Sequence, residues 1–124
     1  MKAAKPNRKT GIAHLIAATG YSIAGARRLS RESAARHELL LGAGGLGALA
    51  FFGASVWHYV GFVTLLAVLI AVEALNTAIE EVVDHISPEW SQMAKDAKDM
   101  SSLAVGLMVL ATLGYLGAVI TWLI

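Results

Sequence analysis

The hydrophobic and polar positions divide the chain into long apolar runs separated by short polar segments. From Leu39 to Val72 there is no Lys, Arg, Asp or Glu over 34 residues, and Leu103 to Ile124 form another uncharged run of 22 residues. One membrane span needs about 20 such residues. The first run is too long for one span and too short for two spans with a turn, so the second span must include polar residues after Val72. We therefore expect an all-α integral membrane protein with three transmembrane helices.

The same pattern predicts a single membrane domain with an amphipathic helix before the spans. Apolar side chains recur at i, i+3, i+4 and i+7 within residues 12–19, which is typical of a helix with one apolar face. The predicted segments are a basic tail (1–10), a surface helix (11–36), a first span (39–57), a second span with a cytoplasmic extension (60–86), a cytoplasmic loop (87–101) and a third span (102–124). At 1.5 Å per residue the second span would be about 40 Å long, which exceeds the roughly 30 Å hydrocarbon core.

The positive charges lie on one side of this arrangement. Of the ten Lys and Arg residues, eight precede Glu38, and Lys95 and Lys98 lie between the second and third spans. Positive residues mark the cytoplasmic side of a membrane, so we expect the N-terminus inside and the C-terminus outside. The basic stretch 23–36 fits a helix on an anionic membrane surface. Glu32 and Glu38 do not, because an acid gains nothing from that surface.

Several common chemistries are absent from the sequence. The chain has no cysteine, which excludes disulfides and thiolate chemistry. Gly42–Gly47 (GAGGLG) has the spacing G-x-G-x-x-G, but no strand or βαβ unit surrounds it. We interpret these small residues as a surface for close helix packing. The G-x-x-x-x-G-K-[ST] loop and the protein-kinase motifs are missing, and we expect no nucleic-acid partner.

Three polar residues, Glu73, Asn76 and Glu80, lie in the second predicted span. The two carboxylates are seven residues apart, so they share one helix face about 10 Å apart along the axis, with Asn76 between them. Ionisable residues at membrane depth are costly and indicate function. Glu73 lies within the membrane, where it can accept a proton from a lipid hydroxyl. Glu80 lies at headgroup level, where a carboxylate can hold Mg²⁺ together with substrate phosphates.

These residues alone leave the class of protein open. Lys95 and Lys98 can neutralise ATP phosphates, or they can form an ordinary solvated helix start. The acids fit a metal-dependent enzyme, and Glu73 also fits the carrier carboxylate of an oligomeric proton-coupled transporter. A purely structural membrane subunit, with Asn76 in a polar seam between chains, is a third interpretation. The loop lysines weigh against the transporter, which has no need to bind phosphate.

The segment Val72–Asp84 (VEALNTAIEEVVD), followed by Ala97–Met100 (AKDM), closely resembles the prokaryotic diacylglycerol kinase family. Ala18–Ser22 (ATGYS) and Arg31-Glu32 resemble it too, and the resemblance covers about residues 11–122. It implies a small lipid kinase of the bacterial inner membrane, with a surface helix and three spans per subunit, assembled as a homotrimer among membrane lipids. It also implies transfer of the ATP γ-phosphate to a lipid hydroxyl with Mg²⁺, at cytoplasmic sites shared between subunits.

The resemblance further implies roles for individual residues. Glu73 would be the general base, and Glu32 and Glu80 would bind the metal that accompanies ATP. The ATP-binding residues would be Tyr21, Glu32, Asn76, Glu80, Glu89, Trp90, Ser91, Lys98 and Asp99. The lipid substrate would contact Ala18, Thr19, Gly20, Tyr21, Ser22, Ile23, Glu73 and Ser102.

Two lipid substrates are compatible with the motifs around Glu73 and Glu80, because undecaprenol kinases share them. The runs Ile86–Ser91 (ISPEWS) and Lys98–Ser102 (KDMSS) look more like the diacylglycerol members of the family. We therefore expect diacylglycerol as the substrate and phosphatidic acid as the product, with undecaprenol as the alternative substrate.

Overall fold

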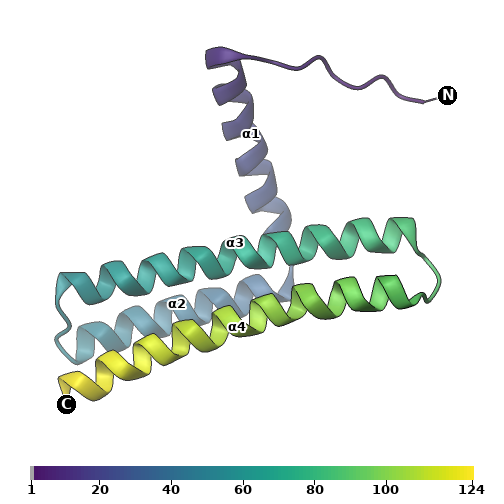
Figure 1. Ribbon diagram of the computed structural model, residues 1–124. Coiled ribbons are helices and arrows are strands. Elements are labelled where there is room, and N and C mark those ends of the chain that lie inside the picture. The colour runs from purple at the N-terminus through teal and green to yellow at the C-terminus, as the bar shows by residue number, and fades with distance from the viewer. Residues whose placement is uncertain (1) are drawn as a thin grey trace.

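The protein is helical along almost its whole length in a computed structural model that describes residues 2–124 (Figure 1). The helices are α1 (Gly11–Leu29), α2 (Ser33–Phe51), α3 (Val56–Ile86) and α4 (Gln92–Leu123). No strand occurs in the described part of the chain. The all-α fold predicted from the sequence is therefore confirmed.

Helices α3 and α4 form a long antiparallel hairpin, and α2 packs beside it (Figure 1). Leu49 of α2, Phe62 of α3 and Val119 of α4 meet in one buried cluster. The approach of α2 to α3 depends on Gly45, because a Cβ atom at this position would lie 2.2 Å from the ring of Phe62. The small residues of α2 thus let two helices come close, as the packing interpretation of Gly42–Gly47 predicted.

Two of the helices, α3 and α4, are long and apolar enough to cross a membrane. The sequence pattern also predicted a first span at 39–57, but α2 is not among the helices that are long and apolar enough to cross a membrane. Its first two turns carry Arg36 and Glu38, and the uncharged part from Leu39 to Phe51 is about 20 Å long. The structure therefore supports an integral membrane protein with two evident candidate spans.

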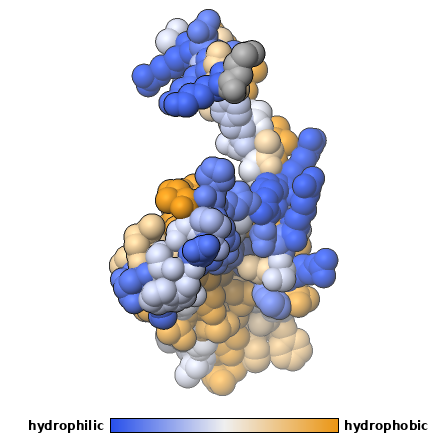
Figure 2. Space-filling view, turned by 90° about the vertical axis from the view of Figure 1, so that its right-hand side faces the viewer, coloured by the Kyte–Doolittle hydropathy of each residue, from blue (hydrophilic) through white to orange (hydrophobic). Residues whose placement is uncertain are grey.

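Helix α1 projects away from the bundle and buries none of its residues (Figure 1). Its apolar stripe is open, with Ile12, Leu15 and Ile16 each more than 60% exposed. Residues 2–10 precede it without regular structure, and Met1 of the predicted basic tail lies outside the described residues. Seen from the α3–α4 turn, hydrophilic residues gather at the N-terminal end of the chain and around that turn, while hydrophobic residues cover the flank of the bundle (Figure 2).

Three element boundaries differ from the predicted ones. The surface helix expected at 11–36 ends at Leu29, where the chain turns through Ser30–Glu32, and residues 33–36 already belong to α2. The loop expected at 87–101 is shorter, because Ser91 caps α4 by accepting a hydrogen bond from Ala94 N at 3.1 Å. The first span expected at 39–57 is interrupted after Phe51 by a turn in which Gly53 has a φ of 71°.

Candidate active site beside the α3–α4 turn

A polar stripe runs along α3 from the interior of the bundle to its hydrophilic end. Glu73, Asn76 and Thr77 are buried, with Glu73 only 6% exposed, whereas Glu80 is exposed. The Asn76 amide Nδ2 donates a long hydrogen bond of 3.4 Å to Glu80 Oε1. One carboxylate is thus enclosed by helices and the other is exposed.

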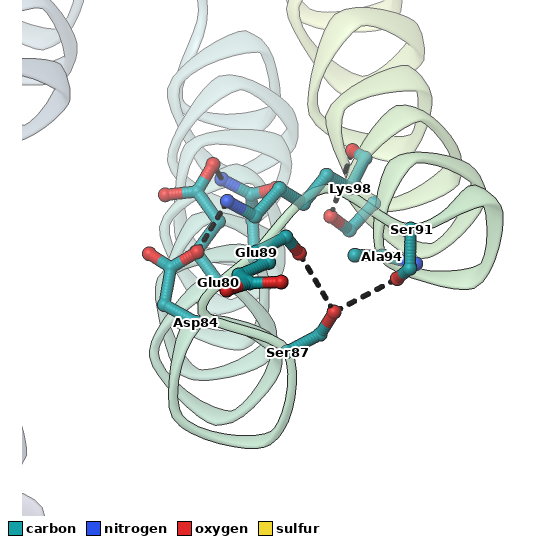
Figure 3. Close-up of polar contacts among 9 residues, drawn as sticks. Glu80, Asp84, Ser87, Glu89, Ser91, Ala94 and Lys98 are labelled. Carbon is teal, nitrogen blue, oxygen red and sulfur yellow. Dashed lines mark hydrogen bonds and ion pairs between the residues drawn. The ribbon is translucent and has the colours of Figure 1, made fainter.

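Beyond Glu80, the α3–α4 turn borders a cavity of about 360 Å³. Serine hydroxyls shape this turn: Ser87 Oγ donates to Glu89 O at 3.0 Å and lies 2.8 Å from Ser91 Oγ (Figure 3). The cavity is lined by Asp84, Ser87, Pro88, Glu89, Trp90, Ser91, Ala94, Lys95, Lys98 and Asp99. Five of the residues predicted to bind ATP are therefore brought together around one opening.

Lys98 crosses from α4 to α3 at the edge of this cavity. Its ammonium group donates to Asp84 Oδ1, and its backbone carbonyl accepts a 3.1 Å hydrogen bond from Ser101 Oγ (Figure 3). The Lys98 and Asp84 side chains are 41% and 64% exposed. Ion pairs in such positions stabilise a protein by only about 0.2–1 kcal/mol. A phosphate group can therefore compete with Asp84 for Lys98.

A second charged cluster joins the end of α1 to α3. Arg28 donates from Nη1 to Glu32 Oε1 at 2.5 Å and from Nη2 to Glu81 Oε1. The hydrogen bonds to Glu32 and then Glu81 raise the pKa of Arg28 above its ordinary value, so the guanidinium stays charged. Glu81 follows Glu80 in α3. One guanidinium group thus links Glu32, a predicted metal ligand, to Glu81, the neighbour in sequence of the other predicted ligand.

The remaining predicted site residues are not assembled within one chain. Residues 18–23, expected to contact the lipid, lie on α1, where Tyr21 is 69% exposed. Ser102 is exposed on α4. Glu73, which belongs to the same predicted set, is buried in the bundle. The single chain therefore brings together most of the predicted nucleotide side of the site but leaves its lipid side open.

One buried acid, Glu38, has no role in the sequence-based predictions. It is 8% exposed on α2, and its Oε1 has no hydrogen-bond partner among residues 2–124. Glu38 also lines a mostly apolar groove of about 530 Å³ with Leu66 and Ile70 of α3. A buried polar atom without a partner needs an explanation, and functional use is one of them. The signal in the sequence was its position as the last charge before the long uncharged run.

The carboxylates present fit a magnesium ion that shares its ligands with a nucleotide. In the described part of the chain no three His, Asp or Glu side chains form a closed cation site. Glu80 is exposed and the Glu32 side chain is 35% exposed, so both are accessible from solvent. Mg²⁺ is commonly held by one or two carboxylates with substrate phosphates rather than by an all-protein cage.

Comparison with known proteins accounts for these features together. The model of the prokaryotic diacylglycerol kinase family matches residues 20–120. A diacylglycerol kinase from Sinorhizobium sp is 47% identical over 104 residues, covering 84% of this chain and 76% of the relative. The diacylglycerol kinase of Escherichia coli (strain K12) is 35% identical over 125 residues, covering 95% and 93%. That of Haemophilus influenzae is 33% identical over 99 residues, covering 79% and 84%. This chain therefore belongs to the prokaryotic diacylglycerol kinase family, a family of integral membrane enzymes.

Proposed function

We propose that this chain phosphorylates the free hydroxyl of diacylglycerol with ATP and that Glu73 is the general base. The observation that carries the proposal is the stripe on α3, where buried Glu73 and exposed Glu80 share one face that leads to the polar cavity. In the reaction a bond forms between the lipid oxygen and the γ-phosphorus, and the bond from that phosphorus to the bridging oxygen of ADP breaks. The hydroxyl proton passes to the Glu73 carboxylate.

The α3–α4 turn supports a role in holding ATP. Its cavity falls within the size range of small-molecule sites, and it offers hydroxyl groups from Ser87 and Ser91 beside the charge of Lys98. Lys98 would exchange its ion pair with Asp84 for the nucleotide phosphates. Catalysis of phosphoryl transfer depends mainly on positioning of the two substrates and on electrostatic stabilisation, because the protein takes little part in covalent chemistry.

Glu32 and Glu80 would hold Mg²⁺ next to those phosphates. When bound, the metal neutralises phosphate charge during transfer. Asn76 contributes by bonding to Glu80 Oε1, which orients that carboxylate from the buried side. Two roles would thus be divided along α3: Glu73 accepts the proton, and Glu80 holds the metal that neutralises phosphate charge.

We further propose three spans, of which α2 is the first along the chain, a cytoplasmic N-terminus, an external C-terminus and a homotrimer with shared sites. All ten Lys and Arg residues then lie on one side of the membrane. Shared sites are supported by the separation of residues 18–23 on α1 from buried Glu73 within one chain. A second subunit would bring the lipid-contacting residues of α1 or α4 to Glu73.

The test uses purified protein in mixed micelles with Mg-ATP and diacylglycerol, and it measures phosphatidic acid. Glu73→Gln should abolish transfer while binding of a fluorescent ATP analogue is retained, because the amide cannot accept the proton. Asp96→Asn is the matched control, since Asp96 is an exposed acid that bonds to Gln92. Full activity in Glu73→Gln would refute the base assignment.

Undecaprenol is the remaining alternative for the lipid. Equal turnover of undecaprenol and diacylglycerol in the same micelles would remove the substrate preference, and turnover of undecaprenol alone would reverse it. Membership of a kinase family already favours an enzyme over the proton-coupled transporter and the structural subunit.

A further inference from the structure

Arg28 holds two carboxylates from different parts of the fold with one guanidinium group. Nη1 donates to Glu32 in the α1–α2 turn, and Nη2 donates to Glu81 on α3. Arg28 and Glu32 are four residues apart, whereas Arg28 and Glu81 are separated by 53 residues. The guanidinium group of Arg28 therefore connects α1 to α3 as well as to the adjoining α1–α2 turn.

The Arg28–Glu81 ion pair forms at the end of α1, a helix that packs little against the rest of the bundle. None of the residues of α1 is buried, so apolar packing does not set its direction. The backbone of the turn is short and bonded, with Glu32 N donating to Leu29 O at 2.9 Å and Ser30 N to Ala26 O at 3.0 Å. The Glu32 side chain is still 35% exposed. Its carboxylate is consequently placed by Arg28 rather than by burial.

The anchor on α3 lies beside the candidate metal site. Glu81 is adjacent in sequence to Glu80, and Asn76 bonds to Glu80 from the preceding turn. Arg28 thus joins Glu32, one proposed metal ligand, to the helical turn that carries the other. Arg27 and Arg31 flank the same turn of the chain but form no ion pair among the described residues.

We propose that Arg28 is a positioning residue that holds Glu32 against α3, with Glu81 as its anchor, so that Glu32 and Glu80 can serve one cation. This inference rests on the proposed metal role of those two glutamates. It assigns to Arg28 and Glu81 a function that depends on the two-pronged geometry of the guanidinium group.

Charge and geometry predict opposite effects for the loss of Arg28. A cation beside Glu32 repels Mg²⁺, so removal of that charge alone would lower the Mg²⁺ concentration needed for activity. If Arg28 instead places Glu32, its removal raises that concentration. Arg28→Lys separates the two contributions further, because lysine keeps the charge but lacks the fork that spans two carboxylates.

The experiment compares Arg28→Met, Arg28→Lys and Glu81→Gln with the matched control Arg27→Met, which removes the same charge from the same helix end. The three test variants should raise the half-saturating Mg²⁺ concentration about fivefold, the range of a surface ion-pair network, with kcat changed less. A second readout needs no turnover: hydrogen–deuterium exchange of residues 26–33 in the protein without nucleotide or Mg²⁺. Exchange should accelerate severalfold in the three test variants and stay unchanged in Arg27→Met.

The outcomes distinguish this inference from the function on which it rests. A lowered Mg²⁺ requirement in Arg28→Met with unchanged behaviour of Arg28→Lys would show a purely electrostatic effect and overturn the inference. Unchanged exchange at residues 26–33 would overturn it as well. Glu32→Gln is measured in parallel: if it alters the Mg²⁺ requirement while the Arg28 variants do not, only the positioning role fails. If Glu32→Gln has no effect, the metal role of Glu32 fails first.

Discussion

Lys98 of α4 and Asp84 of α3 form an ion pair that joins the two arms of the long hairpin beside its polar cavity. The two residues are 14 positions apart, and the intervening turn through Pro88 brings them together. This pair places a half-buried cation at the mouth of the proposed nucleotide site.

Replacement of Lys98 should weaken ATP binding. Lys98→Met removes a charge-assisted contact worth about 1.5–3 kcal/mol, so KM for ATP should rise about 10- to 100-fold. Lys95→Met is the matched comparison, because Lys95 pairs with Asp99 along the same helix, and it should have the smaller effect. Steady-state kinetics at saturating diacylglycerol measure both. Equal KM values for Lys98→Met and the parent protein would exclude Lys98 from the phosphate site.

Shortening the side chain at position 73 should lower kcat. Glu73→Asp keeps the carboxylate but withdraws it by about one methylene from a buried position. Because a misplacement of about 1 Å can reduce a rate about 100-fold, we expect a loss of that order in kcat with KM for ATP little changed. Measurement of kcat at saturating ATP and diacylglycerol, and of KM for ATP, tests this expectation. A proportional rise in KM without loss of kcat would indicate a binding role instead.

The Mg²⁺ concentration needed for activity should change when Glu80 is replaced. Chelation of divalent ions should stop phosphatidic acid formation, and Glu80→Gln should raise the half-saturating Mg²⁺ concentration about tenfold by removing one of two carboxylate ligands. Glu89→Gln, an acid at the α3–α4 turn that is not proposed as a metal ligand, is a useful comparison. A parallel rise in both variants would point to general loss of negative charge near the site.

The glycines of α2 should differ sharply in their tolerance of alanine. Gly45→Ala places a methyl group 2.2 Å from the Phe62 ring, so it should destabilise the fold by about 1–3 kcal/mol. Gly47→Ala and Gly44→Ala meet nothing within 4 Å in the chain and should be neutral or slightly stabilising in a helix. Unfolding in SDS, followed by tryptophan fluorescence, ranks the three variants. Equal stability of Gly45→Ala and Gly47→Ala would show that α2 and α3 do not pack as described.

Much of the fold was predictable because its signals are local. The helical period alone puts Glu73, Asn76 and Glu80 on one face, and the folded chain keeps them there. Runs without charge located α3 and α4. Helix ends were less predictable: the break at Ser30–Glu32 and the cap at Ser91 depend on individual turn hydrogen bonds that leave only a weak trace in composition.

Local sequence accounts for the helices, for the polar stripe of α3 and, through its long motif, for the family. The charges that meet across helices follow instead from the tertiary fold: Lys98 with Asp84 and Arg28 with Glu81. The same holds for the burial of Glu38, whose Oε1 has no hydrogen-bond partner among residues 2–124. The physical reason is that periodicity sets which side chains share a face over a few residues, whereas contacts between helices depend on turn geometry and on the close approach of their backbones. Arg28 shows the difference most plainly, because nothing in its local sequence indicates a partner 53 residues away.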